Sequence, residues 1–107
     1  MNYFVAQFGA EETKLVIIDK HKKVIDSSSA TLDDNNYVKQ LADSLIELAH
    51  KNDLYHDDLN GIGLIINDIK QINYFDNKTL INDLESTFNF KAILEDNYDA
   101  LIDNIVK

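Results

Sequence analysis

The sequence has 107 residues, of which 45% are hydrophobic, and its 19 acidic and 10 basic residues give a formal net charge of -9. This length suffices for one compact core and is too short for two ordinary domains, so we expect a single domain over residues 1–107. The charge disfavours nucleic acid as a partner, because a polyanion would approach against a repulsive field.

The first thirty residues predict three adjacent strands. The run from Tyr3 to Asp19 indicates two strands joined by a tight turn near residues 9–12, and a third strand follows at 24–30. The apolar stretch 15–18 is continuous, as expected of a central strand that is covered on both faces. The basic residues 20–23 lie between two predicted strands, and we interpret them as a solvated hairpin turn.

A helix is expected next, because the polar residues 27–36 are rich in side chains that cap helix starts. Its apolar face recurs at steps of three and four residues. That face consists of Val38, Leu41, Leu45 and Leu48, with Ala42 and Ala49 beside them. Asn52 is expected to end the helix, since asparagine tolerates the left-handed conformation. A polar connection leads to the apolar run 61–66, which predicts a buried parallel strand.

The last third of the chain predicts two more helices and one strand. Residues 69–76 indicate only a loop with buried side chains, followed by a helix up to Asn89 and a strand at 90–95. The final segment predicts a helix capped by Asp96 or Asn97. Tyr98, Leu101, Ile102 and Ile105 form its apolar stripe.

The predicted order is βββαβαβα, which indicates an α/β fold. Three adjacent strands followed by alternating helices and strands favour a mixed five-stranded sheet, in which an antiparallel meander is extended by parallel strands through right-handed crossovers. This order matches the first domain of the sugar kinase, Hsp70 and actin group, which has a ribonuclease-H-like layout.

Three segments resemble the ROK family, which comprises repressors, open reading frames and kinases of sugars. Residues 3–19 resemble its opening pattern of strand, Asp-x-Gly-Gly-Thr, strand and Asp. Residues 60–66 resemble its glycine-rich strand, and residues 80–97 resemble its helix, strand and Glu-Asn-Asp-Ala-Asn segment. The order and spacing match over nearly the whole chain. The resemblance implies the N-terminal ATPase-type domain of such a protein, without the second lobe.

The departures from the family pattern begin at the first turn. Gln7 takes the place of the first aspartate, Ala10 that of the second glycine and Glu11 that of the threonine, whereas Gly9 matches. In the family the glycines let the backbone approach a nucleotide phosphate, and the aspartate works near the metal. Glu11 and Glu12 would place two negative charges close to the phosphates of ATP. Each carboxylate facing a phosphate at about 4 Å costs about 1 to 4 kcal/mol, so we expect this turn to reject ATP.

The other departures follow the parallel strands. Asn67 and Asp68 stand where the family has Pro-Gly, and Asn97 follows Glu95 at the position of the catalytic aspartate. An asparagine side chain cannot take a proton from a sugar hydroxyl. The resemblance also implies a second domain, a zinc site with cysteines in many members and a helix-turn-helix in the repressors. We expect this chain to lack all three.

Metal-dependent chemistry has little support in the sequence. A ribonuclease-H-like sheet could gather Asp19, Asp68 and Glu95 around two magnesium ions, but such a nuclease also needs an acid at the position of Gln7 and a basic groove. The three histidines have no recognised ligand spacing. We therefore expect neither a metal site nor another cofactor.

The absence of cysteine excludes disulfides, thiolate metal ligands and a cysteine nucleophile, and it fits a reducing compartment. The N-terminal stretch has no basic flank and is interrupted by Gln7, so it predicts neither a signal peptide nor a membrane span. We expect a cytoplasmic protein without a membrane partner.

The apolar stripe of the last helix has two interpretations. It can pack on the sheet of its own domain, or it can join Tyr74 and Phe75 in an exposed surface that drives self-association or partner binding. We predict a non-catalytic ROK-like binding or regulatory module, as a homodimer. The alternative is one subunit of a split sugar kinase that phosphorylates a hexose or an N-acetylhexosamine, and a remnant without selected activity remains a third interpretation.

Overall fold

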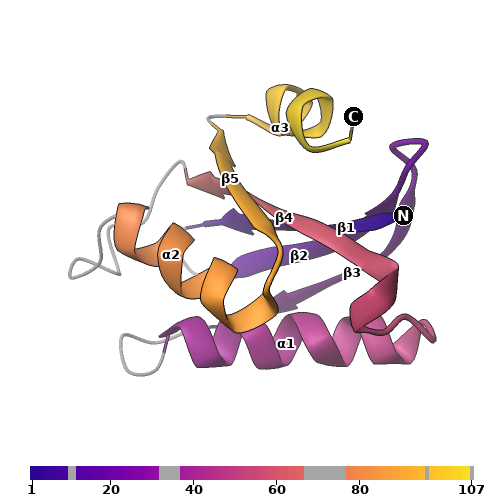
Figure 1. Ribbon diagram of the computed structural model, residues 1–107, viewed down its shortest axis with the longest axis horizontal. Helices are drawn as coiled ribbons and strands as arrows, with labels where there is room; N and C mark the ends of the chain where they lie inside the picture. The colour runs from indigo at the N-terminus through magenta and orange to yellow at the C-terminus, as the bar shows by residue number, and fades with distance from the viewer. Residues whose placement is uncertain (10–11, 32–36, 67–76, 96, 107) are drawn as a thin grey trace.

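The computed structural model describes residues 1–9, 12–31, 37–66, 77–95 and 97–106. A five-stranded sheet is covered by two helices on one face and by one helix on the other (Figure 1). The strands are β1 (Asn2–Phe8), β2 (Thr13–Asp19), β3 (Val24–Ala30), β4 (Leu59–Ile66) and β5 (Lys91–Glu95). The helices are α1 (Tyr37–Lys51), α2 (Asn77–Phe88) and α3 (Tyr98–Ile105), with a short 3-10 helix, η1 (His56–Asp58). The predicted order βββαβαβα is confirmed.

The sheet has the strand order β3-β2-β1-β4-β5. The first three strands form an antiparallel meander, and β4 and β5 continue the sheet parallel to β1. This is the mixed sheet that the sequence predicts. Within the described part of the chain, none of the helices is long and apolar enough to span a membrane.

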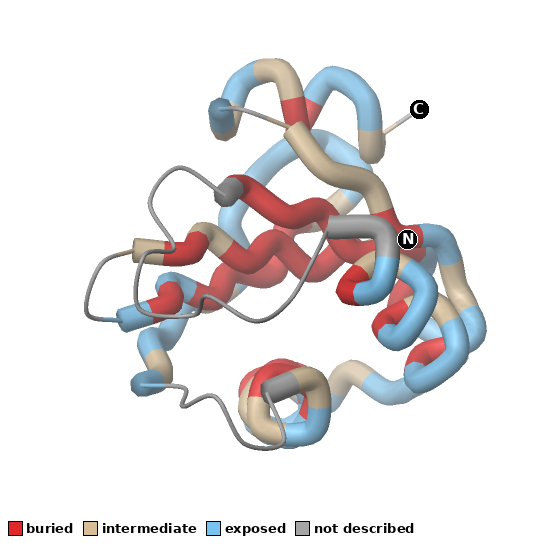
Figure 2. Tube along the Cα trace, turned by 90° about the vertical axis from the view of Figure 1, so that its left-hand side faces the viewer, coloured by how far each residue is buried: buried red, intermediate tan, exposed pale blue. Residues whose placement is uncertain are grey.

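Each face of the sheet has its own core, because side chains alternate along a strand. Phe4, Ala6 and Phe8 of β1 pack toward α1 and α2, whereas Tyr3 and Val5 pack toward α3. Buried residues accordingly follow the strands through the middle of the molecule (Figure 2).

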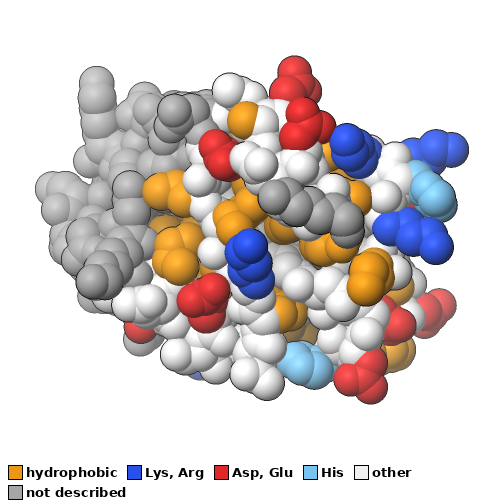
Figure 3. Space-filling view, turned by 45° about the horizontal axis from the view of Figure 1, so that its top comes forward, with side chains coloured by type: hydrophobic (Ala, Val, Ile, Leu, Met, Phe, Trp, Pro, Cys, Tyr) orange, Lys and Arg blue, Asp and Glu red, His pale blue; other side chains and the backbone are white. Residues whose placement is uncertain are grey.

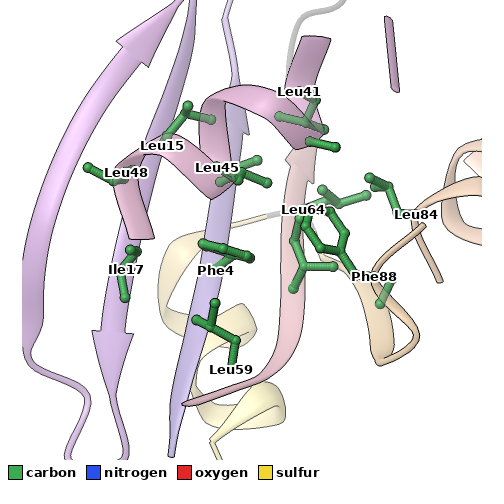
Figure 4. Close-up of a cluster of buried hydrophobic side chains, with 14 of the residues drawn as sticks. Phe4, Leu15, Ile17, Leu41, Leu45, Leu48, Leu59, Leu64, Leu84 and Phe88 are labelled. Carbon is green, nitrogen blue, oxygen red and sulfur yellow. The ribbon is translucent and has the colours of Figure 1, made fainter. Parts of the chain in front are cut away.

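The larger core lies between the sheet and the two helices α1 and α2 (Figure 4). The predicted apolar face of α1 is confirmed, since Leu41, Leu45 and Leu48 are buried against the sheet. Leu84 and Phe88 of α2 enter the same core. At about 25 cal/mol per Å² of apolar surface, such burial is the main contribution to the stability of the fold.

One strand boundary and one left-handed position differ from the prediction. Strand β4 begins at Leu59 instead of residue 61, because Leu59 pairs with Asn2 ahead of a register shift. Helix α1 ends at Lys51, so Asn52 is the stop as predicted, but the left-handed residue is Asp53, with φ 58, and not Asn52. The Asn52 side chain instead donates to the carbonyl oxygen of Leu48 and to the Asp26 carboxylate, each at 2.9 Å, and so joins the helix end to β3.

The basic segment 20–23 forms the exposed hairpin between β2 and β3, as predicted. The Asp19 carboxylate accepts the N–H groups of Lys23, at 3.1 Å, and of His21, at 2.7 Å, and these bonds lower the pKa of Asp19 below its usual value. Lys22 adopts φ 68, and its Nζ lies 3.0 Å from the carboxylate of Asp103 on α3. In the space-filling view, lysine and histidine side chains gather at the right-hand end of the face that is shown (Figure 3).

Candidate functional site at the carboxyl end of the parallel strands

The carboxyl ends of β1, β4 and β5 meet at one edge of the sheet, because the three strands are parallel. The register places Gln7 beside Ile65 and Ile65 beside Glu95, so Gln7 and Glu95 are two strand spacings, or about 10 Å, apart. Gly9 follows β1 and Asn97 follows β5 at the same edge. The other positions of the family pattern lie outside the described residues; they are Ala10, Glu11, Asn67 and Asp68.

The glycine after β1 serves the turn itself. The N–H of Gly9 donates to the carbonyl oxygen of Glu12 at 2.9 Å, which closes the turn between β1 and β2. A Cβ built on Gly9 would lie only 2.8 Å from that oxygen, closer than real Cβ atoms approach a backbone oxygen. The requirement for glycine at this position therefore follows from the turn, without any bound phosphate.

Asn97 is the N-cap of α3. Its backbone is extended, and its side-chain Oδ1 accepts the N–H of Ala100 at 2.9 Å. This bond satisfies one of the free N–H groups that every helix start leaves. Asn97, which the resemblance aligns with the family's catalytic aspartate, therefore uses its side chain to cap α3.

The cap leads to a prediction with a matched pair of variants. We expect Asn97→Ala to lower the free energy of unfolding by about 1 kcal/mol, because the Ala100 N–H loses its side-chain acceptor. Asn97→Asp should keep the stability within a few tenths of a kcal/mol, since aspartate caps helices as well as asparagine. Urea denaturation followed by circular dichroism measures both changes. Equal losses in the two variants would contradict a capping role.

Glu95 and Lys14 place one negative and one positive charge at this edge of the sheet. The Glu95 Oε2 accepts the side-chain N–H of Asn104 at 2.6 Å, which ties this half-buried carboxylate to α3. Lys14 pairs with Gln7 across β1 and β2, and its exposed side chain projects from the same face of the sheet. The sequence interpretation missed Lys14, although a lone charge beside the apolar run 15–18 was the available signal.

The position of Asp19 counts against the two-metal arrangement that the sequence analysis already disfavours. Asp19 pairs with Asn2, five residues along β1 from Gln7, which separates it from the Gln7 and Glu95 edge by about 17 Å. The antiparallel hairpin causes this separation, so Asp19 and Glu95 do not lie at the same site. Asp68 lies outside the described residues. Among those that are described, no three His, Cys, Asp or Glu side chains group closely enough to hold a metal ion.

The apolar stripe of α3 packs largely within its own domain. Leu101 is 0% exposed and Ile102 is 6% exposed, and both belong to the core that Tyr3 and Val5 share with Ile65. Tyr98 and Ile105 are half-buried at the margin of this core. Burial raises the pKa of the Tyr98 hydroxyl above its usual value. The other two residues of the predicted surface, Tyr74 and Phe75, lie outside the described residues.

An apolar pocket of about 170 Å³ lies on the opposite face, between α1, α2 and η1. Its walls include Phe4, Phe88 and Phe90, whose rings lie 5.0 to 6.2 Å apart, and Ile46 and Tyr55 are partly exposed beside it. The pocket is on the other side of the sheet from Gln7 and Glu95 and adds nothing to that edge.

The comparisons with known proteins bear on the fold. No protein-family model matches the sequence, and no curated protein matches it significantly. Among solved structures, Lmo2764 of Listeria monocytogenes, a candidate N-acetylmannosamine kinase, aligns over 89% of this chain with a TM-score of 0.62 and 22% identity. A ROK family transcriptional regulator homologous to E. coli MLC aligns over 87% of this chain, with a TM-score of 0.66 and 9% identity. The ROK hexokinase of Thermus thermophilus aligns over 89% of this chain, with a TM-score of 0.65 and 15% identity.

The chain has a ribonuclease-H-like fold of the ROK type. The fold class predicted from the sequence is therefore confirmed. The ROK-like domain spans 35%, 27% and 35% of the three solved structures, about a third of their length. At these identities the likeness shows the fold alone.

Proposed function

We propose that this ROK-like domain is a non-catalytic binding or regulatory module of the cytoplasm that self-associates. The observation that carries the proposal is the Asn97 side chain, which caps α3 at 2.9 Å from the Ala100 nitrogen. A carboxylate at this position could act as a general base, whereas an amide cannot. Gln7 at the end of β1 supports the same conclusion, because it provides a neutral amide where the ROK pattern has an aspartate that works near the metal.

A kinase assay tests the absence of catalysis. We expect the purified chain, with magnesium-ATP and either a hexose or an N-acetylhexosamine, to transfer phosphate no faster than a sample without protein. Asn97→Asp keeps the helix cap and should remain inactive as well, since Gln7 still lacks a carboxylate. Sugar phosphate formed in proportion to the concentration of the wild-type chain would overturn the proposal.

The second candidate function is one subunit of a split or hetero-oligomeric sugar kinase. The lengths of the aligned proteins favour this function, because the alignment covers 89% of this chain but only 35% of Lmo2764. In that case a separate polypeptide would supply the other lobe. Mixing the chain with proteins encoded beside it distinguishes the two functions: sugar phosphorylation that requires both polypeptides supports the split kinase, and a stable complex without turnover supports a binding module.

A further inference from the structure

Strand β3 is one edge of the sheet and, within the described residues, pairs only with β2. Its middle, Ser27 to Ser29, is in regular register with β2 and exposed to solvent. On a regular edge strand every second residue points its N–H and C=O groups away from the sheet. Proteins commonly protect such edges with lysine, proline or bulges. A bulge lies between Val24 and Asp26 at the start of β3, whereas the three serines that follow it are not interrupted.

The opposite edge is better protected. On β5 the N–H of Ala92 donates to the Glu85 carboxylate of α2 at 3.1 Å, and charged residues begin and end the strand. On β3 the Asp26 carboxylate accepts the N–H of Ser27 at 2.8 Å, which covers only the start of the serine run. The two edges therefore differ, and β3 is the better site for adding a strand.

Exposed apolar side chains lie on the same edge strand. Val24 is 56% exposed and Ile25 is 40% exposed, so two large β-branched residues of β3 face solvent. With the serine runs paired antiparallel, these two side chains lie beyond the paired segment of residues 26–30, so the pairing itself rests on the backbone hydrogen bonds of strand addition.

The neighbouring surface of α1 indicates which strand would pair. Ser28 and Ser29 line a polar groove of about 230 Å³ together with Ser44, Glu47 and Lys51 of α1, so the strand edge and the helix surface are continuous. Glu47 and Lys51 have opposite charges and are one helical turn apart, and Lys51 Nζ already lies 3.7 Å from the Asp26 carboxylate of β3 in the same chain. In a twofold arrangement two α1 helices run antiparallel, which brings Glu47 of one copy toward Lys51 of the other. The surface is thus complementary in charge to itself.

We propose that two copies of this chain form a twofold dimer in which their β3 strands pair antiparallel and their α1 helices lie side by side. The two five-stranded sheets then become one continuous sheet. The proposal rests on the self-association proposed above and assigns its surface, which is separate from the α3 stripe.

The first test is a lysine at the centre of the strand. Pairing the two runs Ser27 to Ser29 antiparallel puts the twofold axis near Ser28, so Ser28→Lys would place like charges opposite each other and should raise the Kd of the dimer at least about tenfold. Ser28 is exposed, so the thermal unfolding of the variant monomer should remain unchanged. Ser86→Lys makes the same exchange at an exposed serine of α2 and should leave the Kd unchanged. Analytical ultracentrifugation over a range of concentrations measures each Kd.

The second test exchanges the charges on α1. Glu47→Lys and Lys51→Glu each place like charges across the interface, so each variant alone should dimerise more weakly than the wild type. An equimolar mixture of the two variants restores opposite charges in the heterodimer, whose Kd should be at least about tenfold lower than that of either variant alone. The same gain would not arise if α1 lay outside the interface.

The outcomes separate this surface from self-association itself. A wild-type chain that stays monomeric at every concentration overturns both proposals. A wild-type dimer that Ser28→Lys and the α1 variants leave intact overturns the β3 surface alone. Hydrogen exchange gives an independent readout, since the amides of β3 should be protected in the dimer and exchange fast in Ser28→Lys. Protection that appears only after an unrelated β-strand peptide is added would assign the edge to a foreign strand and overturn the dimer.

Discussion

Gly63→Ala is expected to lower the free energy of unfolding by about 1 to 3 kcal/mol, because it forces a methyl group into a filled space. A Cβ built on Gly63 would collide with Cδ1 of Leu101 and lie 2.7 Å from its Cγ. Leu101 is 0% exposed and has no room to turn toward solvent. Either α3 moves away from β4 or the Leu101 side chain leaves its rotamer, and both cost stability. Urea denaturation gives the difference from the wild type.

A double-mutant cycle provides the control. Leu101→Ala alone should cost about 2 to 5 kcal/mol, because it leaves a cavity under α3. In the double variant the new methyl group at position 63 enters that cavity, so the combined loss should be smaller than the sum of the single losses by at least about 0.5 kcal/mol. Strict additivity would mean that α3 does not rest on Gly63.

The contact between Gly63 and Leu101 gives the glycine-rich strand a role in packing. Residues 60–66 resemble the ROK family's glycine-rich strand, which in the family precedes a loop near the phosphate. In this chain the space above Gly63 is taken by the Leu101 side chain of α3. Gly9 is likewise explained by the turn that it closes with Glu12. Gly9 and Gly63 therefore have roles in turn geometry and packing that do not depend on a bound nucleotide.

The fold was largely predictable because its strands and helices have clear periodicities. Phe4 and Val5 lie on opposite faces of β1, as alternation predicts, and Leu41, Leu45 and Leu48 share one helix face. The details that were missed depend on tertiary contacts. Strand β4 begins early because Leu59 meets Asn2, and the left-handed residue after α1 is Asp53 because the Asn52 side chain bonds to Leu48 and Asp26.

The candidate site was predictable in position and less so in chemistry. Residues that follow parallel strands gather at one edge, which places Gln7 and Glu95 together. The far position of Asp19 also follows from an antiparallel hairpin, so the sequence contained enough information to exclude it from that edge. The edge position of β3 follows from the strand order, which the predicted ribonuclease-H-like layout implies and the periodicity of the residues alone does not.

Phe4→Ala is expected to be among the most destabilising single substitutions in this chain, with a loss of about 3 to 5 kcal/mol. Phe4 is 0% exposed on the central strand, and its ring centroid lies 5.6 Å from that of Phe88 and 6.2 Å from that of Phe90. It also lines the 170 Å³ pocket, so its truncation would enlarge an existing hollow. Total stabilities of small domains are about 5 to 15 kcal/mol, so a large share would be lost.

Phe90→Ala is the matched control for this prediction. Phe90 stacks on Phe88 with a centroid distance of 5.0 Å but is only half-buried, so the same truncation removes less buried surface and should cost clearly less than Phe4→Ala. Thermal and urea unfolding compare the two variants. If Phe4→Ala cost no more than Phe90→Ala, the rings of Phe88 and Phe90 would have to move in and refill the space. The contact between α2 and the central strand would then be far more adaptable than the packing of these three rings implies.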